Sequence, residues 1–113
     1  MLCFEGKTRR EIEDWRRKID QTDDKLLELL NRRTQFTSAI GELKREHDVA
    51  LYDPERENTI FERLASINQG PLSSDAVQRI FERIIDESRH AQKLIMDRNA
   101  ETQKSRQPKE KKS

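Results

Sequence analysis

The sequence predicts an all-α protein with three helices per chain, one of them very long. Only three glycines and three prolines occur in 113 residues, so few positions break a helix. Hydrophobic residues make up 32% of the chain and charged residues 40%, against roughly 45–50% and 25% in an ordinary globular domain. Apolar residues recur at helical spacing, and the sequence lacks the alternation typical of β-strands.

The first helix is expected from about Thr8 to about His47, because no proline lies inside it and Gly41 is its only weak point. At ~1.5 Å per residue this makes a rod of about 60 Å, whereas a compact domain of this length is very roughly 35 Å across. We therefore expect a second copy to cover the rod, giving an intertwined six-helix homodimer. The apolar seam to be covered consists of Ile12, Trp15, Ile19, Leu26, Leu29, Phe36, Ile40 and Leu43.

Two shorter helices are expected to follow. The pair Asp53-Pro54 supplies an N-cap and a first helical residue for the second helix, and Asn68–Pro71 ends it. The third helix is expected to begin near Ser73 or Ser74 and to fray after Met96. The predicted apolar faces are Ile60, Phe61, Leu64 and Ile67 in the second helix, and Val77, Ile80, Phe81, Ile84, Ile85 and Ile95 in the third.

A single helical domain is expected at residues 8–99, between an N-terminal extension at 1–7 and a disordered basic tail at 100–113. Residues 104–113 hold five basic residues and one acidic residue, which leaves 18 basic and 21 acidic residues in 1–103, a net charge of −3. An acidic body argues against broad nucleic-acid binding, because nucleic-acid-binding proteins normally carry a basic face.

The chain shows no signal peptide, and no stretch approaches the ~20 apolar residues of a membrane span. These features predict a cytoplasmic protein without a membrane partner. Cys3 is the only cysteine, so an internal disulfide is excluded and no zinc site is suggested.

Polar residues occupy positions where the helical pattern calls for apolar ones. Arg33 occupies a position in the apolar seam of the first helix. Lys44 lies eleven residues further on, about 20° around the helix axis from Arg33. Glu57 lies on the apolar face of the second helix, and Ser88 and Gln92 continue the apolar stripe of the third. Polar groups at such positions lower stability unless they have partners. Together they predict a pocket for an anion inside a helix bundle.

Several of these residues also have simpler explanations. Arg33 could extend its head into solvent, Glu57 could interact with the helix dipole, and Ser88 could bond to its own helix. Asp53 is explained as a cap, and Arg56 could pair with either acid. The sequence shows no nucleophile–histidine pair, metal-spaced cluster or glycine-rich phosphate loop. The pocket is therefore expected to bind a dianion and to act by positioning and electrostatics, without a nucleophile.

Five stretches stand in a recognisable order: Trp15–Asp20, Asp23–Arg33, Ile40–Lys44, Asp53–Glu57 and Ile84–Gln92. In this order and spacing they resemble the all-helical class of chorismate mutases, over roughly residues 12–95. The resemblance implies an intertwined six-helix homodimer that converts chorismate into prephenate in aromatic amino-acid biosynthesis. It also implies a pericyclic reaction without cofactor.

The resemblance implies a role for each polar residue. Arg16 would reach into the partner subunit's site and hold a substrate carboxylate, and Arg33 would hold a carboxylate within its own subunit. Lys44 and Gln92 would donate to the ether oxygen, where negative charge grows as the C–O bond breaks. Glu57 and the backbone near Asp53 would hold the ring hydroxyl, with Ser88 and Arg56 assisting at the ring carboxylate.

One residue departs from the family pattern, since Tyr52 stands where some members carry a basic residue. Three other functions are weighed against the mutase. One is an isochorismate pyruvate lyase of the same fold, and another is a non-catalytic helical regulatory module. The third is a nucleic-acid binder that uses the basic tail, which would bind less tightly as salt rises. An activating partner enzyme is a further possible partner of a mutase.

Overall fold

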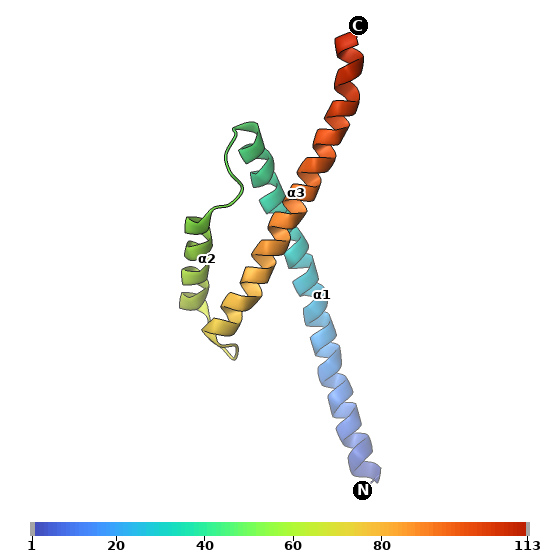
Figure 1. The fold of residues 1–113 in the computed structure, drawn as a ribbon. Coiled ribbons are helices and arrows are strands. Elements are labelled where there is room, and N and C mark those ends of the chain that lie inside the picture. The colour runs from blue at the N-terminus through green and yellow to red at the C-terminus, as the bar shows by residue number, and fades with distance from the viewer. Residues whose placement is uncertain (1, 113) are drawn as a thin grey trace. The chain divides into compact units, whose positions relative to one another are not determined.

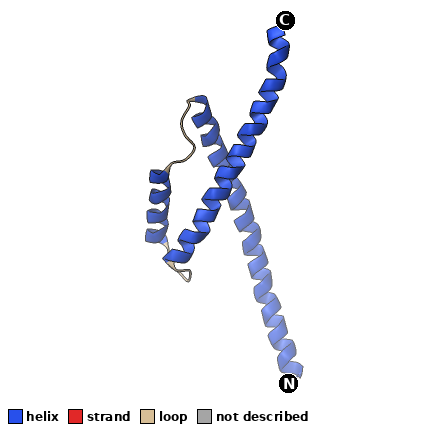
Figure 2. Cartoon of the chain, viewed as in Figure 1, coloured by secondary structure: helices blue, strands red, loops and turns tan. Residues whose placement is uncertain are grey.

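The computed structural model describes the backbone of residues 2–112 and the side chains of residues 6–95, 97 and 98. Over this described backbone the chain forms helices and no strand, as Figure 2 shows. The helices are α1 (Leu2–Glu46), α2 (Pro54–Ile67) and α3 (Ser74–Lys112) (Figure 1). The all-α prediction with three helices per chain is confirmed. The chain divides into two compact units, Met1–Arg32 and Arg33–Ser113, which are described separately.

Two helix ends differ from the expectation. α1 begins at Leu2 instead of Thr8, and α3 continues to Lys112, beyond the fraying expected after Met96. Between residues 74 and 107 no glycine or proline interrupts α3, and its polar residues are mostly fair helix formers. The side chains of the predicted tail at 100–113 lie outside the described residues. The division into an extension, a domain and a tail therefore stays a prediction.

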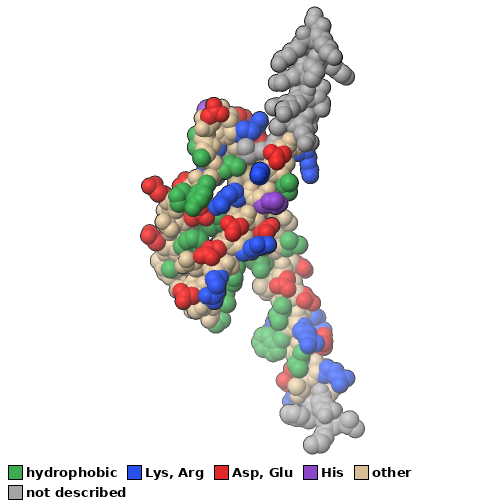
Figure 3. Space-filling model, viewed as in Figure 1, with side chains coloured by type: hydrophobic (Ala, Val, Ile, Leu, Met, Phe, Trp, Pro, Cys, Tyr) green, Lys and Arg blue, Asp and Glu red, His purple; other side chains and the backbone are tan. Residues whose placement is uncertain are grey.

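The first unit is a helical segment, and most of the apolar side chains described in it are exposed. Figure 3 shows hydrophobic side chains lying uncovered among charged ones along this part of α1. Burial of apolar surface is the dominant favourable contribution to folding and association, so the expected homodimer, which would cover this row, stays a prediction. Between 44% and 63% of the surface remains exposed at Ile12, Trp15, Ile19, Leu26 and Leu29.

In the second unit α2 packs against α3 (Figure 1). The most buried apolar side chains are Ile60 of α2 and Ile85 of α3, which are 6% and 9% exposed. Both belong to the predicted apolar faces. α3 also contacts the last part of α1, where Gln92 lies beside the buried Gly41. The end of α1, α2 and α3 thus surround one shared space.

Side-chain caps explain where α2 and α3 begin. The Asp53 carboxylate accepts a hydrogen bond from the backbone N–H of Arg56 at 3.1 Å, so Asp53 is the N-cap of α2. The Ser73 hydroxyl accepts one from the backbone N–H of Ala76 at 3.1 Å. Ser73 is therefore the cap of α3, and Ser74 is its first helical residue.

In the described part of the chain, no helix combines the length and the apolar content that a membrane crossing requires. The cytoplasmic location stays a prediction.

Replacing Ser73 by alanine should lower the free energy of unfolding by about 1 kcal/mol, because the N–H of Ala76 loses its acceptor. Ser74→Ala is the matched control and should change stability by only a few tenths of a kcal/mol, roughly the spread for surface positions. Urea unfolding followed by circular dichroism measures both. Equal losses in the two variants would show that Ser73 is not the cap.

Candidate functional site

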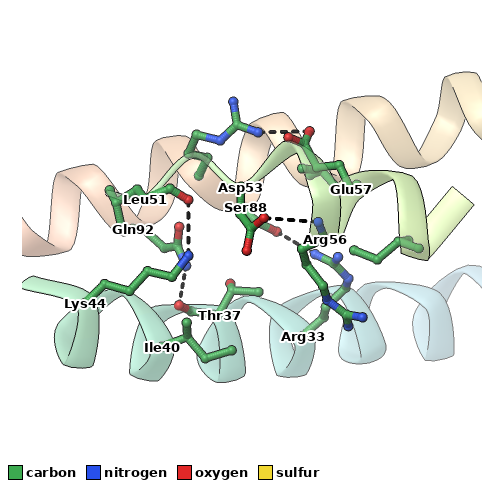
Figure 4. A pocket seen from close by; sticks show the side chains of 13 residues that line it. Arg33, Thr37, Ile40, Lys44, Leu51, Asp53, Arg56, Glu57, Ser88 and Gln92 are labelled. Atoms are coloured by element: carbon green, nitrogen blue, oxygen red, sulfur yellow. Dashed lines mark hydrogen bonds and ion pairs between the residues drawn. The ribbon is translucent and has the colours of Figure 1, made fainter. Parts of the chain in front are cut away.

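The second unit holds a cavity of about 150 Å³, bounded by the end of α1, the loop before α2, α2 itself and α3 (Figure 4). Seven of the residues that the sequence predicted for a site line it. They come from three helices and a loop, and their sequence positions span almost sixty residues. The lining consists of Arg33, Thr37, Ile40, Lys44, Leu51, Asp53, Arg56, Glu57, Ile60, Ile85, Ser88, Arg89 and Gln92.

Arg33 and Ser88 form one end of the cavity. The Arg33 guanidinium donates through Nη1 to the Ser88 hydroxyl at 3.2 Å, and Ser88 is only 6% exposed. Burial lowers the pKa of the Arg33 guanidinium from its ordinary value, and the positive charges of Arg56 and Arg63 lower it further. Among the described residues no carboxylate lies within ion-pair distance of Arg33. An anion bound here would therefore meet a cation that is not already neutralised.

Lys44 and Gln92 lie together at the other end of the cavity (Figure 4). Lys44 Nζ donates to the backbone carbonyl of Leu51 at 3.4 Å, and Gln92 Nε2 donates to the carbonyl of Thr37. An ammonium group carries three N–H bonds and an amide nitrogen carries two, so each side chain keeps donors for a ligand.

Gly41 lies directly against the side chain of Gln92. A methyl group added at Gly41 would lie 3.5 Å from three side-chain atoms of Gln92, which is ordinary van der Waals contact. A longer side chain would press on the amide and displace it. The glycine that was expected only as a weak point in a helix is thus also a packing position for the site.

The first turn of α2 brings both acids to the cavity. Asp53 is occupied as the cap, and Glu57 accepts a hydrogen bond from Arg89 Nη2 at 3.0 Å. Arg56 contributes its backbone N–H to the cap, while no ion pair of its side chain is seen within the described residues.

Arg89 is the cationic site residue that the sequence analysis missed. It follows Ser88 by one position, which places it about 100° around the helix from Ser88, outside the apolar stripe that Ser88 and Gln92 continue. Its guanidinium also lies over the ring of Tyr52, 5.0 Å from the ring centroid. The spacing of three residues between Arg89 and Gln92 could have placed both on one face of α3.

Arg16 is not among the residues that line this cavity. It belongs to the first unit, where its exposed guanidinium pairs with Glu13 on the same helix at 2.9 Å. Its predicted place in the site of a partner subunit stays a prediction.

The charges of the cavity favour a dianion. Four lining side chains are cationic and two are carboxylates, a net charge of +2. The cationic side chains are spread over the cavity, so they can hold two separated anionic groups. Among the described residues no group of histidine, cysteine and acidic side chains is arranged to hold a metal ion.

Comparison with known proteins identifies relatives of one kind. Residues 15–93 match the family described as chorismate mutase type II, which is more than half of the chain. A bifunctional chorismate mutase/prephenate dehydratase from Neisseria gonorrhoeae is 43% identical over 72 residues, or 64% of this chain and 19% of the relative. The chain thus spans about a fifth of the length of that relative.

Solved structures give the same result. A chorismate mutase from Thermus thermophilus superimposes with a TM-score of 0.72 at 28% identity, covering 74% of this chain and 94% of the other. A chorismate mutase from Helicobacter pylori in complex with prephenate superimposes with a TM-score of 0.71 at 27% identity. That match covers 76% of this chain and 93% of the other.

A small dicarboxylate such as malonate should raise the melting temperature of the protein, because the cavity carries uncompensated positive charge. At ten times its Kd the ligand would add about 1.4 kcal/mol of stability. The Arg33→Leu variant should lose this stabilisation, while the neighbouring Arg32→Leu variant should keep it. The melting temperature in malonate is compared with the melting temperature in sodium chloride at equal ionic strength. An equal malonate effect in wild type and Arg33→Leu would exclude Arg33 as the anion ligand.

Proposed function

The chain belongs to the chorismate mutase type II family, and we propose that it converts chorismate into prephenate by a pericyclic rearrangement. The observation that carries the proposal is the cavity itself, with a net charge of +2 and donors at both ends. Chorismate is a dianion with two carboxylates, a ring hydroxyl and an ether oxygen. Family membership and this donor set support the same reaction.

Lys44 and Gln92 are proposed as the catalytic donors. In the rearrangement the ether C–O bond breaks while a C–C bond forms, and negative charge grows on the ether oxygen. Donors held in advance at that oxygen stabilise the transition state more than the substrate. The free N–H bonds of both side chains at one end of the cavity suit this role.

Arg33, Arg56 and Ser88 are proposed to bind a substrate carboxylate at the opposite end. A carboxylate keeps its charge during the reaction, so these contacts set affinity and hold the reactive conformation. The Glu57 carboxylate and the backbone near Asp53 are proposed to receive the ring hydroxyl. No nucleophile or base takes part in this scheme.

A homodimer is proposed as the working form. The uncovered apolar row of α1 needs a partner surface, and Arg16 is exposed in the N-terminal half of the same helix. In the dimer Arg16 of each chain would hold a substrate carboxylate in the other chain's cavity. The relative from Neisseria gonorrhoeae joins a mutase to a prephenate dehydratase, and we propose an enzyme that acts on prephenate as a partner of this chain.

The proposal is tested by incubating the purified protein with chorismate and identifying the product. Prephenate is the expected product. Turnover of isochorismate alone, with release of pyruvate, would favour a lyase. A folded dimer that leaves both substrates unchanged would favour a regulatory module.

Lys44→Ala and Gln92→Ala should each lower kcat by about 10²–10³-fold, since each removes a donor at developing charge. Lys93→Ala is the matched control, because Lys93 is exposed beside Gln92 and does not line the cavity. Steady-state kinetics give kcat and KM separately. Unchanged kcat in Lys44→Ala would rule out Lys44 as the ether-oxygen donor.

Subunit mixing tests the crossing of Arg16. Arg16→Ala and Lys44→Ala should each be impaired alone, yet a mixed dimer has one complete site. After unfolding and refolding together at equal amounts, the mixture should recover about one quarter of wild-type activity, because half of the dimers are mixed. If the activity of the mixture does not exceed the summed activities of the two variants, Arg16 does not act in the partner's site.

A further inference from the structure

We infer that Arg89 is a positioning residue, which fixes the Glu57 carboxylate for the substrate's ring hydroxyl and is itself held by Tyr52. The inference rests on the proposed function, because the ring hydroxyl belongs to the proposed substrate. Arg89 acts through Glu57 in this scheme and is not a catalytic residue.

The ion pair between Arg89 and Glu57 joins α3 to α2, and both residues line the cavity. Arg89 Nη2 and Glu57 Oε1 are 3.0 Å apart, and the side chains are 33% and 22% exposed. For comparison, Arg83 and Glu87 are 2.9 Å apart within α3, but their side chains are 78% and 59% exposed. An exposed pair contributes little because water and salt screen it, whereas a half-buried pair keeps more of its strength.

The pair leaves Glu57 able to serve a ligand. A carboxylate has two oxygens that each accept hydrogen bonds, and Arg89 occupies only Oε1. The guanidinium thus restrains a flexible side chain while Oε2 stays available as an acceptor. Because the acceptor is already fixed, substrate binding costs less conformational entropy.

Tyr52 also contacts the Arg89 guanidinium. The guanidinium carbon lies 5.0 Å from the centroid of the Tyr52 ring, within the range of a cation–π interaction. Tyr52 directly precedes Asp53, the N-cap of α2. The three side chains therefore tie the loop, the first turn of α2 and the middle of α3 together beside the cavity.

The test measures chorismate turnover by Arg89→Leu, with Arg83→Leu as the matched control on the same helix. We expect kcat/KM to fall roughly tenfold to a hundredfold in Arg89→Leu, the loss expected for a hydrogen bond to a charged group. Arg83→Leu should keep wild-type kinetics. If the wild type turns over chorismate normally and Arg89→Leu keeps its kcat/KM, this inference is overturned while the proposed function stands.

A double-mutant cycle separates positioning from direct substrate contact. In a Glu57→Gln background, Arg89→Leu should cause little further loss, because its effect passes through Glu57. A chorismate analogue without the ring hydroxyl should likewise react equally with wild type and Arg89→Leu. Independent, multiplying losses would show that Arg89 contacts the substrate itself and would overturn the inference.

Tyr52 provides a second variant that does not depend on the folding of Arg89→Leu, since its side chain is 57% exposed. Tyr52→Phe keeps the ring face and should retain wild-type kcat/KM, whereas Tyr52→Leu should lose about two- to fivefold. Equal kinetics in both would overturn the role of Tyr52. Absence of chorismate turnover by the wild type would overturn the proposed function and this inference with it.

Discussion

The half-buried guanidinium of Arg33 lies near the like charges of two other arginines. Arg33 donates to Ser88, while the positive charges of Arg56 and Arg63 lower its pKa and no carboxylate among the described residues pairs with it. Such an arrangement reduces the stability of the empty protein and increases its affinity for an anion.

The contact between the end of α1 and α3 positions the Gln92 amide in the cavity. The Gln92 side chain lies against Gly41 of α1, and its amide donates to the carbonyl of Thr37. Gln92 is thereby held at the end of the cavity opposite Ser88, although both residues lie on α3, one turn apart. The Lys44 and Gln92 donors and the Arg33 guanidinium thus line different parts of one small cavity.

Much of this could be predicted because it depends on local chemistry. The cap at Asp53 and the polar interruptions of apolar stripes follow from residue type and helical spacing. The limits of α1 and α3 were harder, since charged segments without glycine or proline contain no clear stop signal. Arg89 was missed because its partner Glu57 is 32 residues away, and no spacing rule connects two helices.

The order of residues was enough to establish three helices, an uncovered apolar row and a set of inward polar side chains, since these follow from the period of a helix. Only the tertiary structure determines which side chains pair with one another. Arg33 bonds to Ser88, and Glu57 pairs with Arg89 instead of Arg56. A helical pattern shows which way a side chain points around its own axis, but only the packing of one helix on another determines what it meets.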